Sequence, residues 1–237
     1  MKYQNVFKRY EVKYLITRKQ QKIILQAMEN LTVPDKYGKS TICNLYFDTP
    51  DYLLIRRSIE KPVYKEKLRL RTYGMAHSDT QAFAEIKKKY KSVVYKRRVD
   101  MPYSQALNYL KGKGGAPGGQ INSEIEYFLQ FYENLAPRVF ISYERQAFYS
   151  KDDPDFRMTF DQNILWRDYD LDLTKGIYGN KILQDNMVLL EVKTKGAIPL
   201  WLTAVLNQNK IYKTSFSKYG NAYKEIFYRK QEVKNYA

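Results

Sequence analysis

Lysine and arginine recur at every second position in several short stretches of this 237-residue sequence. In the stretch EKLRLRTYG, residues 66–74, an extended chain places Lys67, Arg69 and Arg71 on one side, because side chains of a strand alternate between its faces. Lys65 shares that side. Like charges repel at this spacing, and none of the four offsets its neighbour. Such a row of cations suits an anion, and phosphate oxygens match both the planar fork of Arg and the ammonium of Lys.

The same alternation recurs in other stretches and brings in a few carboxylates. In six further stretches the following residues share one strand face: Glu11 with Lys13, Glu85 with Lys87, Lys96 with Arg98, Tyr143 with Arg145, Arg157 with Thr159 and Asp161, and Glu191 with Lys193. An antiparallel sheet with one solvated face shows such alternation too. The excess of Arg and Lys over carboxylates instead favours a closed barrel whose charged faces point inward.

A barrel of this kind has a cationic interior, and unpaired cations in a confined space are costly unless an anion neutralises them. A linear chain of phosphates meets that need. The inward carboxylates Glu11, Glu85 and Glu191 either bind a hard divalent cation, Mg²⁺ or Mn²⁺, or form internal ion pairs. We favour the metal for Glu191 and leave both interpretations open for the other two.

The elements that position these residues are mainly short strands. Strand-like patterns cover residues 7–16, 40–48, 64–73, 81–89, 92–100, 138–149, 156–162 and 187–195. Apolar residues at helical spacing follow capping patterns at Thr17 and at Ser123, which predicts two helices. A third helix is predicted with Pro199 in its first turn, and a fourth from Ser217 to about Gln231. The glycine-rich residues 111–119 read as a flexible connector. The predicted fold class is α+β: an eight-stranded antiparallel β-barrel with flanking helices, in one domain spanning residues 1–237.

Composition limits the partners. The net charge of +16 attracts polyanions, while 44% hydrophobic residues indicate a packed scaffold that carries this charge. We expect no nucleic acid as a ligand, because a nucleic-acid binder sets its cations along an open surface among aromatic residues.

No apolar run reaches the roughly 20 residues of a spanning helix, so we expect a cytoplasmic protein, with peripheral attachment to a membrane partner left open. The single cysteine, Cys43, is expected to be a core thiol.

Eight motifs occur in an order and spacing that resemble a known family: RYEVKYLI, NLYFDTPD, EKLRLRTYG, FAEIKKK, SYERQAFY, FRMTFDQNI, LLEVKTKG and FSKYGNAY. The chain resembles the VTC domain, the polyphosphate polymerase domain of the triphosphate tunnel metalloenzyme superfamily, which is related to CYTH domains. The resemblance implies a barrel that forms a tunnel, with basic residues around a triphosphate or polyphosphate chain and a metal at a tunnel glutamate.

Site residues follow from the resemblance by motif. It implies phosphate ligands for catalysis at Arg69, Arg71, Lys87, Arg145 and Arg157, substrate-binding residues at Lys13, Arg57, Lys96, Tyr143, Lys193, Ser217 and Lys218, and a metal ligand at Glu191. Arg56 is the alternative to Arg57. Lys65 and Lys67 lie nearer the start of the same strand as Arg69 and Arg71, and we place them only at the tunnel mouth. Arg9 stands where many superfamily members carry the first glutamate of Glu-x-Glu-x-Lys, which counts against a two-carboxylate metal site.

The function implied is metal-dependent phosphoryl transfer from ATP to the end of a growing polyphosphate chain, with Mn²⁺ or Mg²⁺ as cofactor. A tripolyphosphatase or nucleoside triphosphatase, in which water is the acceptor, uses almost the same residues. A polyphosphate-binding module without catalysis is the non-enzyme alternative. Partners would be ATP or another triphosphate, polyphosphate and, as in some family members, a membrane protein.

Overall fold

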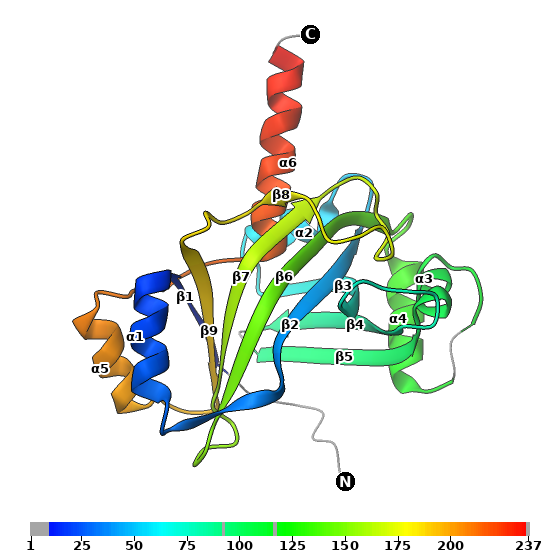
Figure 1. Ribbon diagram of the computed structural model, residues 1–237. Coiled ribbons are helices and arrows are strands. Elements are labelled where there is room, and N and C mark those ends of the chain that lie inside the picture. The colour runs from blue at the N-terminus through cyan, green and yellow to red at the C-terminus, as the bar shows by residue number, and fades with distance from the viewer. Residues whose placement is uncertain (1–9, 92, 116–117, 236–237) are drawn as a thin grey trace.

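One antiparallel sheet organises the computed structural model, which describes residues 10–91, 93–115 and 118–235 (Figure 1). Its ten strands are β1 (Tyr10–Thr17), β2 (Thr32–Asp48), β3 (Tyr64–Tyr73), β4 (Gln81–Tyr90), β5 (Val93–Pro102), β6 (Ala136–Ser150), β7 (Arg157–Arg167), β8 (Asn180–Lys181), β9 (Met187–Thr194) and β10 (Lys213–Thr214). Its six helices are α1 (Arg18–Met28), α2 (Leu53–Ile59), α3 (Tyr103–Leu110), α4 (Gln120–Phe131), α5 (Leu200–Gln208) and α6 (Lys218–Asn235). The strand order is β10-β1-β9-β7-β6-β2-β3-β4-β5, and β8 pairs with β7.

The eight longer strands correspond to the eight predicted ones, which confirms the α+β class and the antiparallel sheet. The first predicted strand began at residue 7 and the fifth at residue 92, and residues 7–9 and 92 lie outside the described part, as do 116–117 of the predicted connector. The structure adds the helices α2 and α3 and the two-residue strands β8 and β10. It also extends β2 by eight residues toward its start, beyond the range 40–48.

The sheet curls but is not closed by backbone hydrogen bonds. Among the described strands, β10 and β5 remain at opposite ends of the strand order, so the closed ladder of the predicted barrel is wrong. Side chains nevertheless meet across the curl: Lys87 of β4 lies 3.7 Å from Glu11 of β1, although five strands separate these two in the sheet. The charged strand faces therefore line the concave side, as predicted.

Apolar clusters cover the other side of the sheet. Helices α3 and α4 pack on the β3–β5 region at one flank, and α1 and α5 pack together at the other (Figure 1). A third cluster joins α2 and α6 to one end of the concave face, where apolar residues replace charged ones; it includes Ile42, Tyr46, Ile141, Leu189, Tyr219 and Ile226. Beyond this contact α6 projects away from the sheet (Figure 1). None of the described helices is long and apolar enough to cross a membrane.

Helix starts follow the predicted capping in two of three cases. Thr17 and Gln20 form a capping box at α1, and the hydroxyl of Ser217 accepts the backbone N–H of Gly220 at 3.1 Å in α6. The predicted start at Ser123 is wrong. Helix α4 begins three residues earlier, and the Ser123 hydroxyl donates back to the carbonyl of Gly119, as polar residues inside helices often do. Cys43 is buried, as predicted.

A buried aspartate connects the sheet to the start of α6. Asp48, at the end of β2, is fully buried and accepts hydrogen bonds from the backbone N–H groups of Thr49, Leu54 and Ile55 at 2.9–3.0 Å. The hydroxyl of Tyr219 donates to the same carboxylate at 2.8 Å. Asp48 therefore fixes α2 and, through Tyr219, the first turn of α6.

We expect Asp48→Ala to lower the free energy of unfolding by at least about 3 kcal/mol, because it leaves buried backbone N–H groups without acceptors at about 1–3 kcal/mol each. Tyr219→Phe removes one of the four bonds and should cost about 1 kcal/mol. Urea denaturation monitored by circular dichroism measures both values. Equal losses in the two variants would contradict the assigned role of Asp48.

Candidate active site

The concave face is organised around a carboxylate that we had assigned no role. Asp161 of β7 is fully buried, and its two oxygens accept hydrogen bonds from Nε and Nη2 of Arg145 at 2.6 Å each. Nζ of Lys218, in the first turn of α6, lies 2.5 Å from the same carboxylate. Burial alone would raise the pKa of Asp161, but these two cations hold it below its usual value. Asp161 therefore stays ionised and fixes both cations.

Glu191 of β9 lies beside this pair at the centre of a ring of cations. Its carboxylate is 3.2 Å from Nζ of Lys218, 3.3 Å from Nη2 of Arg145, 3.5 Å from Nζ of Lys13 and 3.7 Å from Nζ of Lys193. The side chain is 7% exposed. Burial would raise the pKa of Glu191, yet the surrounding cations hold it well below its usual value. All four cations are predicted phosphate ligands, and the structure brings them together.

A second centre forms around Glu85 of β4. Its carboxylate lies 2.6 Å from Nη2 of Arg69, 2.6 Å from Nζ of Lys96 and 3.8 Å from Nε of Arg71. Arg71 also donates from Nε to Oδ1 of Asn44 at 2.9 Å. Burial lowers the pKa of Lys96 to about 8, although Glu85 opposes this change. Glu85 thus forms internal ion pairs with three predicted ligands, which is one of the two interpretations left open above.

Tyr143 of β6 connects the two centres. Nη2 of Arg71 donates to its hydroxyl at 3.4 Å, while Lys218 and Arg145 lie over its ring at 4.4 and 5.1 Å from the centroid. Burial would raise the pKa of Tyr143, but Arg71, Arg145 and Lys218 outweigh it and lower the pKa to about 8. A phenol held in this way is a strong hydrogen-bond partner for phosphate oxygens.

Lys67 lies deeper than the mouth position that we expected. Its Nζ is 3.3 Å from the hydroxyl of Ser217, a predicted ligand, and 5.9 Å from the centroid of the Tyr219 ring. Burial and the nearby cations, Lys87 first among them, lower the pKa of Lys67 to about 7. Nζ of Lys65, by contrast, donates to the carbonyl of Ser58.

Three predicted ligands lie apart from these centres: Lys87, which pairs with Glu11 at 3.7 Å, Arg157 and Arg57. Arg157 faces the concave side opposite Lys193 in the sheet register, but its guanidinium contacts Asp35 at 3.4 Å and lies over the ring of Tyr149. Arg57 is exposed on α2 and lines a pocket on the outer side of β3. Its alternative, Arg56, is also exposed and pairs with Asp51. The structure therefore brings neither Arg56 nor Arg57 to the concave face, and a phosphate role for Arg57 stays a prediction.

Sequence reasoning missed Asp161 and the depth of Lys67. The alternation placed Asp161 on the same face as Arg157 and Thr159, but an alternating pattern does not show which cations of other strands surround a carboxylate. The hydroxyl of Thr159 is a further candidate phosphate ligand, since it is buried on this face without a hydrogen-bond partner among the described residues. Its neighbour across β7 and β9 is Glu191.

The carboxylates of the concave face suit a divalent metal only if phosphate oxygens of a bound substrate complete its coordination. The described residues contain no group of three or more His, Cys, Asp or Glu side chains that would hold a metal unaided. Burial and the nearby charge of Glu191 raise the pKa of Glu11, but Lys87, Lys193 and Lys13 outweigh them and lower it to about 2. One or two carboxylates completed by phosphate oxygens is the usual environment of Mg²⁺. Glu191, with Glu11 beside it, offers that arrangement.

Comparison with protein families gives a match to the VTC domain over residues 8–227. The chain belongs to the VTC domain family. Two similar solved structures share its fold. One is a "putative adenylate cyclase" from Bacillus halodurans, with 13% identity over 90% of this chain and 96% of the other and a TM-score of 0.57. The second is a "putative adenylyl cyclase" from Hippeastrum described as having a dominant triphosphatase activity, with 14% identity over 88% and 92% and a TM-score of 0.50. None of the curated proteins compared matches this VTC domain significantly.

Replacing Asp161 by asparagine should destabilise the protein by about 3–5 kcal/mol, because it leaves Arg145 and Lys218 buried without their main counter-charge. Tripolyphosphate should restore part of this loss by supplying negative charge. Thermal unfolding with and without tripolyphosphate measures both effects. The control is Asp185→Asn, which removes one exposed partner of Lys181 and should change stability by less than about 1 kcal/mol. A D161N protein as stable as the control would contradict this role.

The lowered pKa of Lys67 leads us to expect that phosphate binding depends on pH. With a pKa of about 7 it is charged below pH 7 and increasingly neutral above, whereas a bound phosphate favours its charged form and raises the pKa. Binding at pH 8 should therefore take up a proton at Lys67, at a cost of about 1.4 kcal/mol per pH unit above 7. Calorimetric titration with tripolyphosphate in two buffers of different ionisation enthalpy should show greater proton uptake in the wild type than in Lys67→Met. Exposed Lys181→Met is the control; equal uptake in all three proteins would exclude the effect.

Proposed function

We propose that this VTC domain transfers the terminal phosphoryl group of a nucleoside triphosphate, with ATP as the expected donor, to the end of a polyphosphate chain held against the concave face. The observation that carries the proposal is the ring of four cations around Glu191: Lys13, Arg145, Lys193 and Lys218. All four share the Glu191 carboxylate, although Arg145 and Lys218 also pair with Asp161, and Lys13 pairs with Glu11. An anion with several negative charges in a row would satisfy them better.

Phosphoryl transfer asks mainly for positioning and for stabilisation of negative charge. A terminal oxygen of the polyphosphate forms a bond to the γ-phosphorus, the bond between that phosphorus and the β,γ-bridging oxygen breaks, and nucleoside diphosphate leaves. Arg69, Arg71 and Arg145 offer planar forks to the phosphate oxygens. Their buried partners Glu85 and Asp161 fix these forks before the ligand arrives, which reduces the ordering needed at the reaction step.

Glu191 is the residue proposed to hold a divalent metal, with Mn²⁺ and Mg²⁺ as the candidates. When bound, the metal would neutralise charge on the transferring group. Binding of the metal would require that the cations around Glu191 move onto phosphate, since they pair with its carboxylate in the structure. The metal and the phosphate chain are therefore expected to bind together.

The test is incubation of the full chain with ATP and Mn²⁺, and separately with Mg²⁺, followed by gel analysis of polyphosphate. Long chains together with ADP support the proposal. Free phosphate without polymer would instead indicate a triphosphatase, with water as acceptor. Tight polyphosphate binding without turnover would indicate a binding module. Both of these outcomes exclude polymer synthesis.

Glu191→Gln should reduce polymer formation at least about 100-fold, because it removes the charge proposed to hold the metal. Binding of polyphosphate should be retained, since the surrounding cations remain. The matched control is Glu144→Gln, whose carboxylate pairs with Lys39 and Asn163 on the other face of β6. Unchanged turnover in E191Q would rule out metal-assisted catalysis at this residue.

A further inference from the structure

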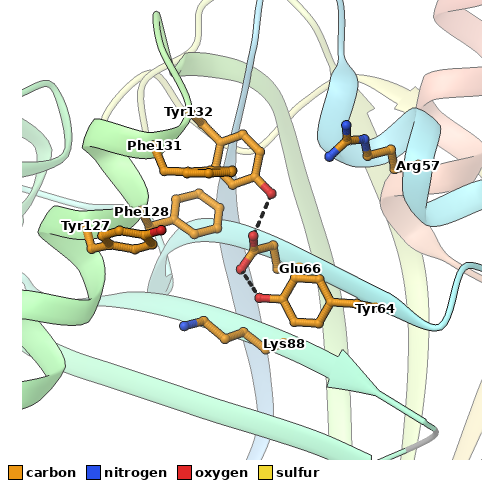
Figure 2. A pocket seen from close by; sticks show the side chains of 8 residues that line it. All are labelled: Arg57, Tyr64, Glu66, Lys88, Tyr127, Phe128, Phe131 and Tyr132. Atoms are coloured by element: carbon orange, nitrogen blue, oxygen red, sulfur yellow. Dashed lines mark hydrogen bonds between the residues drawn. The ribbon is translucent and has the colours of Figure 1, made fainter.

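A pocket of about 270 Å³ lies on the outer side of β3, away from the concave face (Figure 2). It is lined by α4, by the outward-facing residues of β3 and β4, and by α2; the lining residues are Arg57, Tyr64, Glu66, Lys88, Tyr127, Phe128, Phe131 and Tyr132. Strand β3 alternates here, so Glu66 points into this pocket while Lys67 and Arg69 point to the opposite face. The pocket is therefore separate from the ion-pair network described above.

The floor of the pocket is a carboxylate with unused acceptor capacity. Glu66 is 8% exposed and accepts hydrogen bonds from the hydroxyls of Tyr64 and Tyr132 at 2.6 Å each, one at each oxygen (Figure 2). An ionised carboxylate has about four acceptor directions, so both oxygens can accept again. The two tyrosines fix the orientation of the carboxylate, which leaves it able to receive N–H donors from a ligand.

Exposed aromatic rings form the wall. Tyr127 and Phe131 of α4 are 63% and 59% exposed, and their rings stack at 5.9 Å with an interplanar angle of 24°. Phe128 of the same helix is buried beside them, and Tyr64 of β3 lies on the other side of Glu66 (Figure 2). Exposed aromatic side chains in this arrangement suit a flat ring, since stacked aromatic rings attract each other beyond the effect of the area that they bury.

Cations at the rim select among flat ligands. Arg57 approaches from α2 and Lys88 from β4, on opposite sides of the pocket (Figure 2), and Lys88 is paired with Glu124 of α4 at 3.6 Å. The charge of Arg57 disfavours an organic cation, although aromatic rings beside a carboxylate would otherwise attract one. The buried carboxylate and the apolar wall disfavour a bare phosphate chain. What fits is a flat ring with N–H donors that also carries a phosphate group.

We propose that this pocket binds a purine nucleotide. The base stacks on Tyr127 and Phe131, its exocyclic amine donates to Glu66, and its phosphate lies at the rim near Arg57. The volume is slightly below the roughly 300 Å³ at the lower end of small-molecule pockets, so base and sugar lie inside and the phosphate lies outside. Because the pocket faces away from Glu191 and Asp161, the nucleotide here is a second ligand and not the phosphoryl donor.

The test is calorimetric titration of the full chain with AMP while tripolyphosphate saturates the concave face. We expect one AMP to bind per chain. Ribose 5-phosphate, which lacks the base, should bind at least tenfold more weakly. The double variant Tyr127→Ala, Phe131→Ala should weaken AMP binding at least tenfold and leave tripolyphosphate binding unchanged. Its matched control replaces Tyr169 and Tyr212, which are 50% and 75% exposed elsewhere, by alanine and should bind AMP as the wild type does.

Three results would overturn the proposal: no AMP binding under these conditions, equal binding in the double variant, or ribose 5-phosphate binding as tightly as AMP. Glu66→Gln provides a second test, because its amide retains one acceptor and loses the charge. It should weaken AMP binding while circular dichroism and tripolyphosphate binding stay as in the wild type. Each result is independent of polymer synthesis, so failure here leaves the proposed function of the concave face untouched.

Discussion

Three buried carboxylates neutralise a face crowded with cations, and the rest of the structure depends on this balance. Arg145, Lys218, Arg69 and Lys96 would repel each other in a confined space without Asp161, Glu191 and Glu85 between them. Removing water from such charges is costly, and close pairing with additional hydrogen bonds is what offsets the cost. The carboxylates are too few to match the cations one for one, so several cations share one acid. This shortage is what makes the face receptive to a polyanion.

Strand register is the means by which the balance is achieved. Lys13 stands directly opposite Glu191, Arg145 opposite Asp161, and Arg69 opposite Glu85. Opposite charges on facing strands stabilise the pairing, and a slip of one residue would turn each of these side chains to the apolar outer face. The charges that are proposed to bind the ligand therefore also specify the register of the sheet. Helix α6 adds Lys218 from outside the sheet, at a position set by Asp48 through Tyr219.

Much of this arrangement could be read from alternation, and the failures have physical causes. Period-two patterning gave the strands and the faces on which Lys13, Arg69, Arg145 and Glu191 lie, since a buried face leaves little freedom of register. It could not give the partners of Asp161, because Arg145 depends on the register between β6 and β7 and Lys218 comes from the helix α6. The tunnel role of Arg57 is implied by the resemblance alone, and the helix α2, which the alternation does not predict, places this side chain on the outer side. The start of α4 was misjudged because the Ser123 hydroxyl bonds to its own preceding turn.

The open strand order of the sheet gives the interior an adjustable width. Backbone ladders hold β1 to β9 and β3 to β4, but the described contact across the curl between β1 and β4 is an ion pair, Glu11 with Lys87. Such a partly exposed pair contributes up to about 1 kcal/mol and weakens as salt is added, whereas a closed barrel would have to break a row of backbone hydrogen bonds in order to widen. Under the proposed function, added salt would weaken this contact between the two sides, and a phosphate that draws Lys87 away from Glu11 would break it.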